Sequence, residues 1–126
     1  MLFVGFLCVV AVAVVCFVYW KLKSRRLSSS IRRKLEEQWG KLEGIADPAL
    51  RILEAEKVLD QALSVCGYLG SFGEKLKVAG PRFKNIDALW NAHRLRNRIA
   101  HEPGFAVKEA EAERTVRVFR KAFGEL

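Results

Sequence analysis

The feature that most constrains this chain is an uncharged segment near its N-terminal end, from Leu2 to Trp20. As an α-helix rising about 1.5 Å per residue, this segment would be roughly 28 Å long, which matches the hydrocarbon core of a bilayer. A cleaved signal peptide would need a basic region before the apolar stretch and a small-residue cleavage site after it, and neither is present. We therefore predict a retained transmembrane anchor at residues 1–20.

The residues that follow predict how this helix is oriented. Seven basic and no acidic residues lie between positions 21 and 34. Cytoplasmic flanks of membrane helices are enriched in Lys and Arg, and aromatic residues favour the interface. We expect a single pass through the cell membrane, with the N-terminus outside, the C-terminal domain in the cytoplasm, and the lipid bilayer as a partner. The predicted membrane flank is Tyr19, Trp20, Lys21, Lys23, Arg25 and Arg26.

This basic run also accounts for most of the net charge of +8. Of the 22 Lys and Arg residues, 15 lie outside the run and nearly balance the 14 Asp and Glu residues. A nucleic-acid-binding domain would spread its positive charge over a folded face, so the composition alone does not indicate one. The chain beyond the apolar segment is long enough for about one small domain, which excludes a large enzyme.

The cysteines and glycines predict neither a metal site nor a cofactor site. Cys8 and Cys16 lie within the apolar segment and Cys66 stands alone, so no disulfide framework or metal-ligand spacing is present. This pattern favours a reducing compartment. Gly73 lies close to Lys75, but the spacing is not that of a phosphate-binding loop.

The remaining residues predict helices only. Residues 21–46 are expected to form a basic juxtamembrane connector and a short amphipathic helix, and residues 47–126 a helical domain. Asp47 and Pro48 suit the N-cap and first position of a helix that ends at Gly67. Ser71 and Glu74 have the spacing of a capping box, and a last helix is expected over 107–123. No strand pattern appears after residue 20, so the fold class is all-α, with about four helices in the bundle.

A helix expected within residues 85–105 carries the most informative residues. On a helical wheel, Arg96 falls inside the apolar arc, where an arginine must be paired, interfacial or functional. His93, Asn97 and His101 form a polar stripe at the border of this face. Pro103 follows, so His101 should lie in the last turn of the helix.

The segment Arg96-Asn97-Arg98-Ile99-Ala100-His101 resembles the R-x4-6-H motif of HEPN domains. The resemblance covers about residues 47–126. It implies an antiparallel helical bundle that forms a homodimer, with a composite site that cleaves RNA without a metal ion and leaves a cyclic phosphate. In that site Arg96 would stabilise the phosphate, His101 would act as general acid or base, and Asn97 would assist. Pro103 stands where the toxin branch of the family usually has tyrosine.

Other roles remain open for the same residues. Arg96 could pair with an acid such as Glu56 or Glu74, and His93 fits a packed, hydrogen-bonded histidine better than a catalytic one. His101 could be a helix cap. Arg94 and Arg98 are the weak candidates for RNA-backbone contact, or a solvated face. The alternative function is a non-catalytic, membrane-tethered domain that dimerises or docks a membrane or cytoplasmic protein.

Overall fold

The fold is described from a computed structural model that covers residues 1–23 and 25–126. Throughout these residues the regular structure is helical, which confirms the predicted all-α class. The side chain of Lys23, one of the predicted membrane-flank residues, lies outside the described part of the chain. In chain order the elements are α1 (Leu2–Lys23), α2 (Ser29–Leu42), α3 (Pro48–Val65), α4 (Phe72–Ala79), a short 3-10 helix η1 (Gly80–Arg82), α5 (Ile86–His101) and α6 (Glu109–Gly124).

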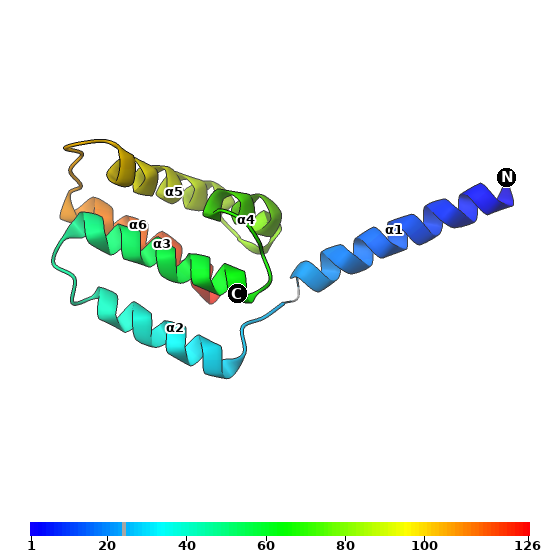
Figure 1. Ribbon diagram of the computed structural model, residues 1–126, viewed down its shortest axis with the longest axis horizontal. Helices are drawn as coiled ribbons and strands as arrows, with labels where there is room; N and C mark the ends of the chain where they lie inside the picture. Colours follow the sequence, from blue (N-terminus) through cyan, green and yellow to red (C-terminus); the bar gives the residue numbers. More distant parts are fainter. Residues whose placement is uncertain (24) are drawn as a thin grey trace.

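Helix α1 lies apart from the other helices (Figure 1), and its apolar side chains are exposed. Its apolar part, Leu2–Lys21, is long enough and apolar enough to cross a membrane. No other part of the described chain buries the large apolar side chains of this helix. Burying such surface is strongly favourable, so an apolar environment would stabilise α1.

Local sequence signals position the bundle helices as expected. The Asp47 carboxylate accepts a hydrogen bond from the backbone N–H of Ala49 at 3.0 Å, and Pro48 opens α3. Ser71 and Glu74 form a reciprocal capping box at the start of α4. Such caps satisfy backbone donors that the first turn of a helix leaves unpaired. These two predicted helix starts are therefore confirmed.

Helix α3 is the centre of the bundle and contacts α2, α5 and α6. Figure 1 shows it between α2 and α5. The side chains at its core are almost completely removed from solvent, and two phenylalanines of α6 complete the apolar interior. The largest fully buried side chains are Ile52, Leu59, Leu63, Leu76, Leu89, Phe119 and Phe123.

Helix α2 belongs to the same core. Its apolar stripe, Leu35, Trp39 and Leu42, is buried, and the Trp39 ring lies 5.7 Å from the ring of Phe123 in α6. Leu27, just before the helix, is buried as well. Residues before position 47 therefore contribute to the core of the bundle. The sequence analysis had instead placed this amphipathic helix in a connector that precedes a domain of residues 47–126.

Candidate functional site

The candidate site is built on α5, which the side chain of Asn85 caps by accepting a hydrogen bond from the N–H of Ala88. The helix ends at His101, where the backbone of Glu102 becomes extended. Buried Leu89 and Ala92 fix one side of α5 against the bundle. Residues 93–101 therefore extend along α5 from the bundle interior to its solvent-exposed end.

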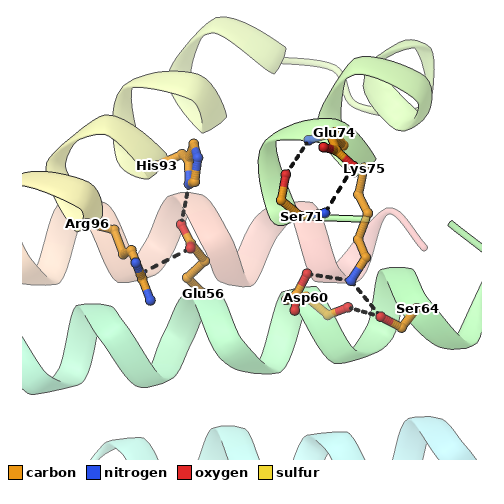
Figure 2. A network of polar contacts seen from close by, with 8 residues as sticks. All are labelled: Glu56, Asp60, Ser64, Ser71, Glu74, Lys75, His93 and Arg96. Carbon is orange, nitrogen blue, oxygen red and sulfur yellow. Dashed lines mark hydrogen bonds and ion pairs between the residues drawn. The ribbon is translucent and has the colours of Figure 1, made fainter. Parts of the chain in front are cut away.

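Glu56 of α3 is the residue around which the interior part of the site is organised. Its side chain is only 6% exposed, and both of its carboxylate oxygens face α5. Oε2 lies 2.8 Å from Nδ1 of His93, and Oε1 lies 3.2 Å from Nε of Arg96, as Figure 2 shows. A buried carboxylate is costly unless it is paired, and here two side chains of the next helix satisfy it.

His93 is held by hydrogen bonds through both of its ring nitrogens. Its Nε2 lies 3.3 Å from Nδ2 of Asn97. Nδ1–H can donate to the Glu56 carboxylate, which leaves Nε2 able to accept from the Asn97 amide. The imidazole also packs against Phe72 and Trp90, with ring centroids 5.0 Å and 5.9 Å away. The interpretation of His93 as a packed, hydrogen-bonded histidine is confirmed.

Arg96 forms an ion pair with Glu56, one of the two acids proposed for it from the sequence. Its Nε–H is not aligned on the carboxylate well enough to make a hydrogen bond, so the contact is mainly electrostatic. The other candidate, Glu74, serves the capping box of α4 instead. The Arg96 side chain remains 33% exposed, so its guanidinium lies at the boundary between the interior and solvent.

A cleft of about 680 Å³ opens beside this network. Its carboxylates are each matched by a cation: Glu54 lies 3.9 Å from Lys57, and Asp60 lies 2.7 Å from Lys75, while Arg96 matches Glu56. The cleft therefore has no excess of positive charge that would attract a nucleic-acid backbone by itself. It is lined by Leu53, Glu54, Glu56, Lys57, Asp60, Ser71, Phe72, Gly73, His93, Arg96 and Asn97.

Lys75 is a buried charged residue for which the sequence analysis predicted no partner. Its side chain is 7% exposed, and its Nζ donates to Asp60 Oδ1 and Ser64 Oγ, both at 2.7 Å (Figure 2). Asp60 and Ser64 are four residues apart on α3, so they lie on one helical face. The spacing of Asp60 and Ser64 could have predicted a polar site on α3. It does not predict which Lys or Arg of another helix binds there.

His101 lies apart from this network. It is the last residue of α5, and its exposed side chain has no hydrogen-bond or ion-pair partner within the described residues. Along a helix, five residues correspond to about 7.5 Å of rise and about 140° of rotation. Arg96 and His101 of one chain therefore point in different directions, and a single copy does not bring the two motif residues together.

The two weaker RNA-contact candidates, Arg94 and Arg98, are exposed on α5. Arg94 donates to the side chain of Asn91. Arg98 pairs with Glu102 at 3.2 Å, and its guanidinium stacks 4.2 Å from the ring centroid of Phe105. Arg98 thus helps to hold the turn after α5.

Other reactive groups add little to this site. Within residues 1–23 and 25–126, no three His, Cys, Asp or Glu side chains gather to hold a metal ion. Cys66 is buried, and burial raises the pKa of its thiol, although nearby arginines oppose the shift. A raised pKa lowers the thiolate fraction, which makes Cys66 a poor nucleophile.

The membrane-flank candidates lie on both sides of Ser24. Tyr19, Trp20 and Lys21 are exposed near the end of α1. Arg25 reaches the bundle, where its Nη1 donates to the backbone carbonyl of Cys66 at 3.4 Å. Arg26 is exposed next to it.

Comparison of the chain with protein-family models, with curated proteins and with solved structures finds no match. The functional assignment therefore depends on the geometry of Arg96, Asn97 and His101 and on the residues that surround them.

Proposed function

We propose that the chain is a membrane-anchored, HEPN-like antiparallel bundle that cleaves RNA without a metal ion, using an active site formed by two copies. The observation that carries this proposal is the arrangement along α5. Arg96 is oriented by Glu56 with part of its guanidinium exposed, and His101 is free at the solvent-exposed end of the same helix. Both residues belong to the R-x4-6-H motif.

The state of Arg96 suits the binding of a phosphate. Its Nε is ion-paired with Glu56, and its Nη groups make no hydrogen bond within the described residues. A guanidinium held from behind loses little further entropy when its outer N–H groups bind phosphate oxygens. In this proposal Arg96 stabilises the negative charge that develops on the phosphate during cleavage.

His101 supplies the proton transfer. A general base removes the proton of a ribose 2′-hydroxyl, and the 2′-oxygen attacks the adjacent phosphorus. The imidazole of His101 takes the 2′-hydroxyl proton, the bond from phosphorus to the 5′-oxygen breaks, and the leaving oxygen takes a proton from an imidazolium of the site. The products are a 2′,3′-cyclic phosphate and a 5′-hydroxyl, and no metal ion takes part. Asn97 is hydrogen-bonded to His93, and this contact holds both side chains in position next to Arg96.

A second copy is needed because Arg96 and His101 diverge within one chain. Half-buried Leu95 and Ile99 lie on α5 near both residues and have apolar surface left to cover. A symmetric dimer through α5 would bury this surface and place the Arg96 of one protomer opposite the His101 of its partner. The anchor would hold this dimer on the cytoplasmic face of the membrane, with the N-terminus outside.

The test is RNA cleavage by the full chain in an uncharged detergent, in buffer that contains EDTA. We expect wild-type protein to cut single-stranded RNA and leave 2′,3′-cyclic phosphate ends. His101→Ala and Arg96→Ala should each abolish cutting, while the exposed neighbour Glu102→Ala should cut like wild type. Cleavage that survives both motif substitutions would refute the proposal.

A second candidate, a non-catalytic tethered domain that uses α5 to dimerise or to dock a protein, is favoured by the balanced charges of the cleft. In that case the Arg96–Glu56 pair only maintains the shape of the α5 surface. Arg96→Ala should then disrupt assembly and lower the melting temperature, whereas His101→Ala should change neither. An Arg96→Ala protein with an unchanged oligomeric state and melting temperature would exclude this function.

A further inference from the structure

Four arginines gather at the end of the bundle that follows α1. Arg25 and Arg26 precede α2, Arg32 lies within α2, and Arg82 comes from η1, half the chain away. Three of them line a hollow of about 340 Å³ together with the end of α6. We call this hollow the arginine pocket; its lining residues are Arg26, Arg32, Arg82, Gly124, Glu125 and Leu126.

Two of the three lining arginines are fixed by the fold. Arg82 donates to the hydroxyl of Tyr68 at 3.5 Å and to the main-chain oxygen of Leu126 at 3.3 Å. Arg32 is half-buried, with its guanidinium 5.3 Å from the ring centroid of Phe123. Guanidinium groups held in advance lose little side-chain entropy when they bind a phosphate group, and their planar forks suit its oxygens.

The acidic groups of the pocket leave positive charge in excess. Glu125 is its acidic side chain, and Oε2 of that carboxylate already accepts the backbone N–H of Lys84 at 3.0 Å. The Leu126 oxygen is occupied by Arg82. Three guanidinium groups therefore exceed the negative charge that faces them, so an anion would be attracted to the pocket.

The chain connectivity places the pocket next to the proposed membrane. Arg26 is three residues beyond the end of α1, so the two positions are separated by at most roughly 11 Å. A helix that spans the bilayer ends among the lipid headgroups, where anionic lipids attract nearby cations. The phosphate that this pocket meets at the highest local concentration is therefore that of a lipid.

We propose that the arginine pocket binds the phosphate of an anionic lipid headgroup and thereby fixes the orientation of the bundle against the membrane. This inference depends on the membrane anchoring proposed above, but not on ribonuclease activity. Arg82 distinguishes a folded site from a simple topology signal, because it lies outside the juxtamembrane basic run and reaches the pocket only through the fold.

The test is titration of the full chain in dodecyl maltoside with phosphatidylglycerol or phosphatidylcholine, followed by native mass spectrometry. We expect saturable binding of phosphatidylglycerol and much weaker binding of phosphatidylcholine. Arg82→Gln and Arg26→Gln should each raise the Kd for phosphatidylglycerol about five-fold, which corresponds to about 1 kcal/mol for one cation near an anionic surface. The matched control Arg94→Gln, which removes an exposed arginine from α5, should bind like wild type.

Equal affinity for both lipids, or an unchanged Kd in Arg26→Gln and Arg82→Gln, would overturn the proposal. If Arg82→Gln fails to fold, exposed Arg26→Gln still decides the question. Glycerol 3-phosphate that displaces the lipid at similar concentration would reject a lipid headgroup in favour of a free anion. Flotation with phosphatidylcholine vesicles tests the anchor separately, since failure to float would contradict membrane anchoring and not the phosphate chemistry.

Discussion

The two ends of the segment from His93 to His101 differ sharply, although both belong to one helix. At the first end, His93, Arg96 and Asn97 are tied to Glu56 directly or through one another. At the other end, the side chain of His101 is exposed and has no partner among the described residues. The motif therefore combines Arg96 and Asn97, whose side chains contact other residues of the fold, with His101, whose side chain does not.

The cause of this difference is the position of α3. Glu56 is buried and must be paired, so the α5 side chains that face it are recruited to satisfy it. The last residue of α5 points to solvent, where no buried charge has to be paired. A side chain with no structural task is free to serve chemistry, and substitutions should separate the two roles.

The largest expected effect is the loss of RNA cleavage in His101→Ala. Removing a general acid or base typically lowers the rate about 10²- to 10⁴-fold. The measurement is the initial cleavage rate of the full chain in EDTA, with Glu102→Ala as the control from the same exposed turn. Equal cleavage rates for His101→Ala and Glu102→Ala would show that His101 is not catalytic. Helix α5 would then be a docking helix.

The next effect concerns the held end of the segment. Glu56→Ala should lower the free energy of unfolding by about 2–3 kcal/mol, because it leaves His93 without its hydrogen-bond partner and Arg96 without its ion-pair partner. Urea unfolding of the full chain in uncharged detergent, followed by circular dichroism, measures this change. The control is Glu54→Ala on the same helix, whose 39% exposed side chain forms only a 3.9 Å pair and should cost less than about 0.5 kcal/mol. Similar costs for both would mean that Glu56 is not central to the network.

Much of this arrangement could be anticipated from local patterns. The start of α3 follows from Asp47 and Pro48, because capping depends only on neighbouring residues. The position of Arg96 on an apolar arc already indicated that it is paired, interfacial or functional. Which acid it meets could not be predicted, because Glu56 and Glu74 were both possible and tertiary packing alone makes the choice.

The role of α2 shows the same limit. The spacing of Leu35, Trp39 and Leu42 predicts an amphipathic helix, but periodicity does not say which surface covers its apolar side. In the structure that side packs against α3 and α6, so it belongs to the core. The arginine pocket could not be anticipated for the same reason, because Arg82 joins Arg26 only through folding.

A smaller effect is expected for Arg96→Ala, at about 1–2 kcal/mol of unfolding free energy. The cost is lower than for Glu56→Ala because His93 still donates to the carboxylate and Arg96 is already one-third exposed. A double-mutant cycle with Glu56→Ala should give an interaction energy of at least about 0.5 kcal/mol. Strictly additive changes would show that the 3.2 Å contact contributes no coupling, and Arg96 would then join His101 among the free residues.

The smallest effect is expected for the stability of His101→Ala, below about 0.5 kcal/mol at neutral pH, because surface substitutions without a partner rarely cost more. The same urea titration measures it, and His93→Ala is the matched histidine control. His93→Ala should cost about 2 kcal/mol, since it removes two hydrogen bonds and the packing of the ring against Phe72 and Trp90. A cost above about 1 kcal/mol for His101→Ala would identify His101 as a structural cap of α5. The motif would then have no free member, and α5 would be a packing and docking helix throughout.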